Sequence, residues 1–148
     1  MKNSLSTITF FTALMQEVTH KPRVAILEDH DDTREMLRIG LEARFATVAY
    51  RSAAELLDAL ERENFSAIVA DIMLPGLDGF GFIKMIRQNV RFADICVIAV
   101  TALAMASDRE KGIAAGFTAY LVKPITPEEI STVLWNHIGP SQDKSPAA

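Results

Sequence analysis

The chain has 148 residues, of which 49% are apolar and 23% are charged, and its formal net charge is −4. These proportions indicate one globular domain with a substantial core and exclude a largely disordered protein. No basic run exceeds two residues and no apolar stretch is long enough for a membrane span, so neither direct nucleic-acid binding nor membrane insertion is expected. The single cysteine, Cys96, lies in an apolar run and is expected to be a reduced core residue of a cytoplasmic protein.

Residues 1–21 form an N-terminal extension in which Phe11, Leu14, Met15 and Val18 have the spacing of one helical face. The segment resembles a secretory signal only weakly, because no small-residue cleavage site follows it. We expect a poorly ordered tail or a short helix packed on the domain. A docking or dimerisation helix is the alternative. At the other end, residues 139–148 are expected to form a disordered tail.

Five segments between residues 22 and 138 have the composition of strands. The runs at 23–27, 67–70 and 95–100 are almost continuously apolar, as strands are when helices cover both faces of a parallel sheet. Shorter runs at 46–50 and 119–122 complete the set. Each of the five is followed by a segment with helical periodicity.

The first helix is predicted over about 32–44, with Asp31 as its N-cap and Met36, Leu37 and Leu41 among its inward-facing residues.

The next two helices are marked by their N-terminal signals. Ser52 and Glu55 have the spacing of a capping box, which predicts the start of the second helix. Pro75 and Gly76 predict a turn before Asp78, which is placed to cap the third helix.

The last two helices differ in how strongly the sequence specifies them. The fourth, near 104–115, carries few large apolar residues, and we expect it to be the most mobile; Gly116 is its predicted C-terminal glycine. The fifth begins with Thr126, Pro127 and Glu129, which combine an N-cap, a first-turn proline and a capping-box glutamate. Strands alternating with helices predict a single doubly wound (βα)₅ domain of the α/β class over residues 22–138.

Polar residues stand where four of the predicted strands end. Glu28 and Asp29 follow the first strand, Asp71 the third, Thr101 the fourth and Lys123 the fifth. If the strands are parallel neighbours, these groups meet at one edge of the sheet. Two unit charges about 4 Å apart interact by about 4 kcal/mol at an effective dielectric constant near 20, so uncompensated carboxylates would repel strongly. A hard divalent cation such as Mg²⁺, which prefers oxygen ligands, relieves this repulsion.

Four sequence blocks closely resemble the receiver domain of two-component response regulators, over about residues 22–138. The blocks are L-E-D-H-D-D at 27–32, D-I-M-L-P-G-L-D-G-F at 71–80, V-T-A at 100–102 and Y-L-V-K-P at 120–124. The resemblance implies a flavodoxin-like parallel sheet of strand order 2-1-3-4-5, which the residues alone leave open.

The resemblance assigns Asp71 as the nucleophile that accepts a phosphoryl group, since a carboxylate can form an aspartyl-phosphate when a cation neutralises the transferring group. It implies that Mg²⁺ is held by Asp71, Asp29, Glu28 (directly or through a water) and the backbone carbonyl of Met73.

The resemblance also gives roles to residues at the ends of the fourth and fifth strands. Lys123 pairs with the phosphoryl oxygens and, before modification, with Asp71. Thr101 turns its hydroxyl toward the phosphoryl group, and Tyr120 is the switch aromatic, inward when phosphorylated and outward when not. In the family the bond equivalent to Lys123-Pro124 is usually cis, although sequence alone does not determine the isomer.

Two apolar residues depart from the family pattern. Met73 and Leu103 occupy positions where family members often carry polar side chains that help to position a water for hydrolysis. We therefore expect slow self-dephosphorylation, which a decay of the phosphorylated protein within seconds would contradict. His30 is interpreted as a solvated loop residue rather than a phosphorelay histidine.

The resemblance implies a phosphorylation-activated switch rather than an enzyme acting on other substrates. Its donor would be a histidine kinase or a histidine phosphotransfer protein. Its output would be a protein partner bound through the fourth helix, fifth strand and fifth helix, with the protein a monomer or a phosphorylation-dependent dimer. A stand-alone regulator and the receiver module of a hybrid kinase acting as a relay intermediate both stay open.

Two other classes use similar folds. A haloacid-dehalogenase-like phosphohydrolase requires a second aspartate where this chain has Met73, and a flavodoxin-type FMN carrier requires a Ser/Thr/Gly-rich phosphate loop where this chain has E-D-H-D-D.

Overall fold

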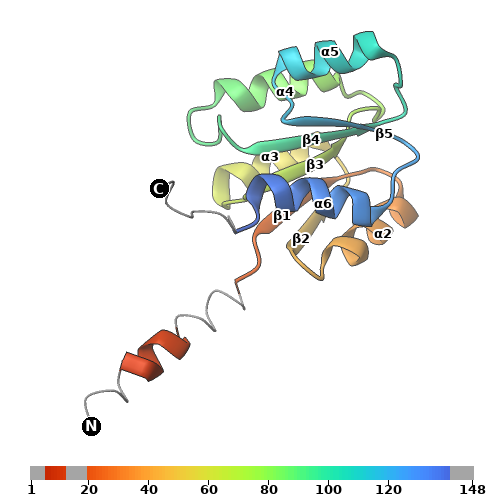
Figure 1. Cartoon of the computed structure of the whole chain (residues 1–148). Coiled ribbons are helices and arrows are strands. Elements are labelled where there is room, and N and C mark those ends of the chain that lie inside the picture. Colours follow the sequence, from red (N-terminus) through yellow and green to blue (C-terminus); the bar gives the residue numbers. More distant parts are fainter. Residues whose placement is uncertain (1–5, 13–19, 141–148) are drawn as a thin grey trace, which may run out of the picture.

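A computed structural model describes residues 6–12 and 20–140 of the chain, and Figure 1 shows its elements. In chain order these elements are β1 (Arg23–Leu27), α2 (Asp31–Leu41), β2 (Ala46–Tyr50), α3 (Ala53–Arg62), β3 (Ala67–Asp71), α4 (Gly79–Gln88), β4 (Cys96–Thr101), α5 (Ala106–Ala115), β5 (Ala119–Val122) and α6 (Pro127–Ile138). The predicted alternation of five strands and five helices is confirmed over residues 23–138.

The five strands form one parallel sheet in the order β2-β1-β3-β4-β5, which confirms the flavodoxin-like topology. Leu27 pairs with Ala70 across β1 and β3, and Thr101 pairs with Val122 across β4 and β5. Because this register aligns the strand ends, the residues after β1 and at the ends of β3, β4 and β5 share one edge of the sheet.

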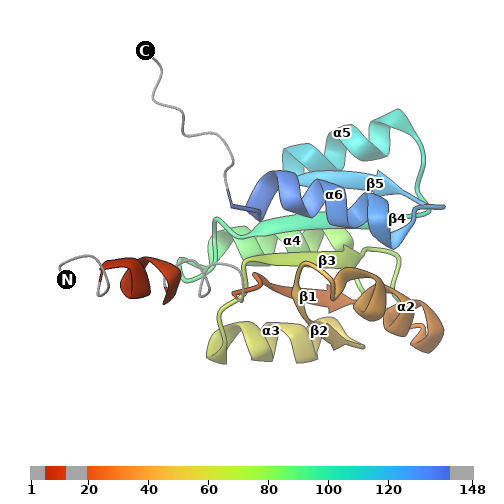
Figure 2. The ribbon, with the colours of Figure 1, turned by 60° about the horizontal axis from the view of Figure 1, so that its bottom comes forward.

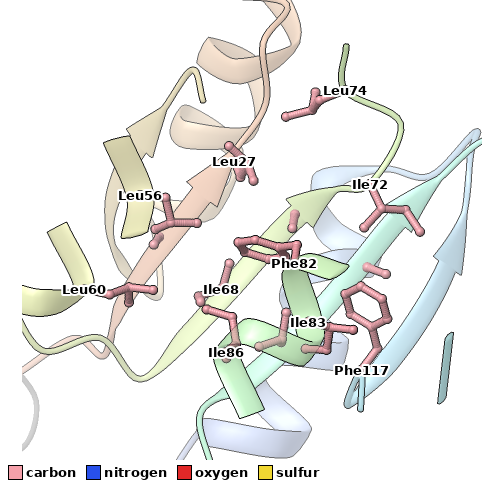
Figure 3. Packing of buried hydrophobic residues seen from close by; sticks show 14 of the residues in the cluster. Leu27, Leu56, Leu60, Ile68, Ile72, Leu74, Phe82, Ile83, Ile86 and Phe117 are labelled. Carbon is pink, nitrogen blue, oxygen red and sulfur yellow. The ribbon is translucent and has the colours of Figure 1, made fainter. Parts of the chain in front are cut away.

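Helices cover both faces of the sheet, α2 and α6 on one and α3, α4 and α5 on the other (Figure 2). Alternate strand residues divide between the two faces: Ala25 and Leu27 of β1 pack with α3 and α4, whereas Val24 and Ile26 pack with α2 and α6. Figure 3 shows the first of these cores, in which Leu56, Leu60, Phe82, Ile83 and Ile86 close over Ile68. Every residue of β3 is buried, as expected for the central strand.

The first helix differs from its prediction at its start and on its buried face. His30, not Asp31, is the N-cap of α2, and its Nδ1 accepts a 3.4 Å hydrogen bond from the amide of Thr33. His30 is therefore more than a solvated loop residue. Leu37 is buried as predicted, but Met36 is exposed, so its predicted inward orientation is wrong.

The other N-terminal signals are borne out almost completely. Asp78 caps α4, and Thr126 and Glu129 form the full capping box of α6. Ser52 caps α3, but Glu55 accepts from the amide of Arg51 instead of closing the box on Ser52.

Helix α5 is the least anchored of the five. It starts at Ala106, two residues later than predicted, and Gly112 is its one buried residue. Gly116 ends it as predicted, with a φ of 122° that residues other than glycine rarely adopt. The predicted scarcity of apolar anchors is confirmed, and its mobility stays a prediction.

Residues 6–12 are helical, and all seven are exposed. Leu14, Met15 and Val18 of the proposed N-terminal helical face, and residues 141–148 of the proposed tail, lie outside the described residues. In the part of the chain that the structure describes, no helix has both the length and the apolar character to cross a membrane.

Candidate functional site

Three carboxylates converge at the carboxyl edge of the sheet. Glu28 and Asp29 leave β1 and Asp71 ends the adjacent strand β3, which brings one oxygen of each side chain within 4.8 Å of the others. The predicted meeting of these three residues therefore occurs, and it follows directly from the pairing of β1 with β3.

Asp71 is held by partners at both of its oxygens. Its Oδ1 accepts a 2.8 Å hydrogen bond from the amide of Met73, and its Oδ2 accepts one of 3.0 Å from Lys123 Nζ. Burial alone would raise the pKa of Asp71, but hydrogen bonds from Glu28, Met73 and Lys123 outweigh it and lower that pKa below its usual value. Asp71 is thus kept ionised, as a nucleophile must be.

Glu28 has the opposite character. It is 3% exposed, and its Oε2 is the one buried side-chain nitrogen or oxygen without a hydrogen-bond partner among the described residues. Burial, followed by its hydrogen bond with Asp71 and the charge of Asp71, raises the pKa of Glu28 to about 7. An unsatisfied buried oxygen normally costs about 1–3 kcal/mol, so a ligand that pairs with Oε2 would stabilise the site.

The donor set fits a hard divalent cation. The three carboxylates offer only oxygen atoms as ligands, and one of these atoms, Glu28 Oε2, has no hydrogen-bond partner among the described residues. These are the ligands that Mg²⁺ prefers. A hollow of about 340 Å³ adjoins the cluster at Asp29, and its lining also includes Arg51 and Pro75.

Lys123 lies directly after the last residue of β5. Its backbone amide donates to the carbonyl of Thr101 at 2.8 Å, which ties the residue to the end of β4. The bond between Lys123 and Pro124 is cis, as the resemblance implied. The side chain crosses from β5 to Asp71 on β3, past β4 between them.

Thr101 and Tyr120 meet around Leu103. The Thr101 hydroxyl accepts a 3.1 Å hydrogen bond from the Leu103 amide, and the Tyr120 hydroxyl donates one of 3.2 Å to the Leu103 carbonyl. Tyr120 is 3% exposed, so its ring has the inward orientation that the resemblance assigns to the phosphorylated state, although Lys123 makes the contact with Asp71 that it assigns to the unmodified state. Burial raises the pKa of the Tyr120 phenol, and a hydrogen bond with Thr101 acts in the opposite direction. The two expected switch residues are therefore linked through the backbone of Leu103.

Arg34 belongs to the site but was missed by the sequence analysis. Its guanidinium donates to the backbone carbonyls of Glu28 and Asp29 in the acidic loop. The only sequence signal was the spacing between Asp31 and Arg34, which is also the spacing of an ordinary ion pair on a helix surface.

Comparison with known proteins agrees with this geometry. The sequence model of the response regulator receiver domain matches residues 24–134. The chain belongs to that family. It is thereby a receiver module of two-component signal transduction.

Relatives of the chain differ in length. An uncharacterized 14.6 kDa protein of Leptolyngbya boryana is 37% identical over 108 residues, which cover 72% of this chain and 82% of that protein. Response regulator Rre1 of Synechocystis is 31% identical over 124 residues, covering 82% of this chain but 54% of Rre1, so the match spans about half of that relative. The structure of the chemotaxis response regulator CheY4 of Vibrio cholerae superposes with a TM-score of 0.73 at 24% identity, covering 79% of this chain and 98% of CheY4, and shows the same fold.

Proposed function

We propose that Asp71 accepts a phosphoryl group from a phosphohistidine of a histidine kinase or phosphotransfer protein. The observation that carries this proposal is the position of the ionised Asp71 carboxylate between the Met73 amide and the Lys123 ammonium, beside an unpaired Glu28 oxygen. That arrangement supplies a nucleophile together with positive and metal-binding groups for a dianionic phosphoryl group.

In the transfer, an oxygen of Asp71 forms a bond to phosphorus while the bond from phosphorus to the donor imidazole nitrogen breaks. The electron pair of the broken bond leaves with the imidazole ring. Lys123 then exchanges part of its contact with Asp71 for a contact with the phosphoryl oxygens, which carry more charge than the carboxylate did.

The residues that would hold Mg²⁺ are Glu28, Asp29, Asp71 and the backbone carbonyl of Met73. When bound, the cation would neutralise negative charge on the phosphoryl group. The protein side chains orient the reaction: the Met73 amide fixes one oxygen of Asp71, and Lys123 fixes the other.

The signal would pass through Thr101 and Tyr120. A phosphoryl oxygen near Thr101 attracts its hydroxyl and favours the inward orientation of the Tyr120 ring, which packs against α5. Each 1.4 kcal/mol of preference changes the ratio of the two orientations about tenfold. The output would be the binding of a protein partner at α5, β5 and α6, where Met105 and Ile113 are exposed.

The remaining parts of the proposal concern setting and lifetime. The protein would act in the cytoplasm, either alone or as one module of a longer chain, as a monomer or a phosphorylation-dependent dimer. Met73 is exposed beside Asp71 and offers no polar group to orient a hydrolytic water, which supports a long-lived aspartyl-phosphate.

The proposal is tested by incubating the protein with acetyl phosphate and Mg²⁺ and measuring its intact mass. We expect the wild type to gain one phosphoryl group, Asp71→Asn to gain none, and excess EDTA to abolish the reaction. Asp78→Asn is the matched control, because Asp78 lies seven residues away as the N-cap of α4 and asparagine preserves capping. Phosphorylation of Asp71→Asn to the wild-type extent would show that the acceptor is another residue.

A further inference from the structure

Arg34 makes an unusual set of contacts for an arginine near the start of a helix. Its Nη1 donates to the backbone carbonyls of both Glu28 and Asp29, at 3.2 Å each, and its Nη2 contacts Asp31 Oδ1. One side chain of α2 thus spans the loop that carries two of the three carboxylates. The opposite side of this loop is anchored by the Glu28 amide, which donates to the Tyr50 carbonyl at 3.1 Å.

The burial of Arg34 shows that its contacts differ from those of an ordinary surface ion pair. Its side chain is 13% exposed, whereas Arg38, one turn further along α2, is 38% exposed and pairs with Glu35 and Glu42. A positive charge near the amino end of a helix is unfavourable with the helix dipole. Two carbonyl oxygens and the Asp31 carboxylate compensate for this placement, so the position of the guanidinium is determined by the loop and not by the helix.

We propose that Arg34 is a positioning residue for the metal site: it holds the backbone of Glu28 and Asp29 so that their carboxylates face Asp71 before any cation binds. This inference rests on the proposed function, since it assumes that the three carboxylates bind Mg²⁺.

The physical reason is preorganisation. Three acidic side chains with oxygens within 4.8 Å of one another oppose one another's ionisation, and a free loop would move the exposed Asp29 away from the other two to relieve this. Clamping two consecutive carbonyls removes that freedom, so less conformational entropy is lost when the cation binds. The planar guanidinium suits this task because it presents several donors in a fixed geometry, which a lysine ammonium lacks.

The inference is tested with Arg34→Met and Arg34→Lys, and with Arg38→Met as the matched control on the same helix. Mg²⁺ affinity is measured by titration calorimetry, and amide hydrogen exchange of residues 28–30 is measured without the metal. We expect both Arg34 variants to bind Mg²⁺ about tenfold more weakly and to exchange these amides faster, while Arg38→Met matches the wild type. Arg34→Lys keeps the charge and the aliphatic stem, so it tests the clamp even if Arg34→Met does not fold.

A merely structural role gives a different result. If Arg34 only stabilises α2, its variants lower the melting temperature but leave the Mg²⁺ affinity and the exchange of residues 28–30 in the folded protein unchanged, and the inference is overturned. Acetyl phosphate separates this failure from failure of the proposed function. If the wild type is phosphorylated on Asp71 but the Arg34 variants bind Mg²⁺ with normal affinity, only the inference is refuted. If the wild type gains no phosphoryl group, the proposed function is refuted.

Discussion

Glu28 and Asp71 are carboxyl groups at the ends of two adjacent strands, and their pKa values are displaced in opposite directions. Asp71 has Lys123 and the Met73 amide as partners and ionises easily, whereas Glu28 is buried with one oxygen unpaired and holds its proton to about pH 7. Environments that separate the pKa values of paired carboxyls are typical of sites where each has its own task. Here they imply that the metal-free site carries a proton, which a cation would displace.

The raised pKa of Glu28 makes the metal-free protein less stable at high pH. Its folded-state pKa of about 7 exceeds the unfolded value of 4.5, so the folded state holds a proton that the unfolded chain has released. The stability conferred by this proton is complete below pH 4.5 and is lost as the pH rises through 7. In EDTA at pH 8, Glu28→Gln should therefore raise the unfolding free energy by on the order of 2 kcal/mol, measured by urea denaturation.

A matched control for this measurement is Glu35→Gln on α2. Glu35 is exposed and its pKa is lowered by a hydrogen bond from Arg38, so its substitution should change the stability by little and in the opposite direction. Mg²⁺ should stabilise the wild type at pH 8 more than Glu28→Gln. Equal stability of the wild type and Glu28→Gln at pH 8 without metal would show that Glu28 is ionised there at no cost.

The sequence predicted where the site residues meet but not their protonation states or their individual contacts. Glu28, Asp29, Asp71 and Lys123 were expected at one edge because each follows an apolar strand, and the structure brings them together there. The unequal protonation of Glu28 and Asp71 depends on side-chain burial and hydrogen bonds, which strand patterning does not determine. The contact of Arg34 with two backbone carbonyls has no pattern in sequence at all, because any arginine at that position could point to solvent.

At the scale of elements, capping signals located the N-cap where that residue is a usual capping residue and failed at α2, where the N-cap is a histidine. Asp78 and Thr126 cap α4 and α6 as predicted, since aspartate and threonine are strong N-caps. The start of α2 was assigned to Asp31 by the same preference, but the imidazole of His30 supplies the acceptor. Met36 was expected to be buried from helical spacing, yet it stays exposed, since α2 buries a narrower face through Leu37 and Leu41.

The ring of Tyr120 on β5 packs against Gly112 of α5 and so joins the two elements. A Cβ atom added at Gly112 would lie 2.6 Å from Tyr120 Cδ2, so the ring lies directly against the backbone of α5. The absence of a side chain at Gly112 gives the inward ring its space. Movement of this ring should therefore displace α5, because Gly112 is the one buried residue among the ten residues of this helix.

Gly112→Leu should turn the Tyr120 ring outward. Leucine is a better helix former than glycine by roughly 0.8 kcal/mol, so loss of the α5 helix is not the expected effect. The ring orientation is measured by ¹⁹F NMR of fluorotyrosine-labelled protein, with Tyr50→Phe used to assign the Tyr120 resonance. Ala114→Leu is the control, since Ala114 is exposed on the same helix. A Tyr120 resonance unchanged by Gly112→Leu would mean that the ring does not depend on this space.

For the whole molecule, two apolar cores on the faces of one sheet hold the domain together. Their buried residues run from Val24 in β1 to Leu134 in α6, so the described helix at residues 6–12 contributes to neither core. The sequence indicated the five-stranded sheet and both helical layers because hydrophobic periodicity reports burial. It left the strand order open, since apolar runs do not specify which strands pair; the order came from the family resemblance.

Deletion of residues 1–19 should leave the melting temperature within about 2 °C of the full chain, since a stability change near 1 kcal/mol shifts it by about 2–8 °C. Ile8, Phe10 and Phe11 are 60–69% exposed, and their removal uncovers no core. Leu134→Ala is the comparison, because truncating a fully buried leucine costs about 2–5 kcal/mol. A deletion as destabilising as Leu134→Ala would show that the extension packs on the domain, contrary to this expectation. An unchanged melting temperature together with lost self-association in sedimentation would instead identify the extension as a dimerisation segment, because its exposed apolar side chains would then be buried only between two molecules.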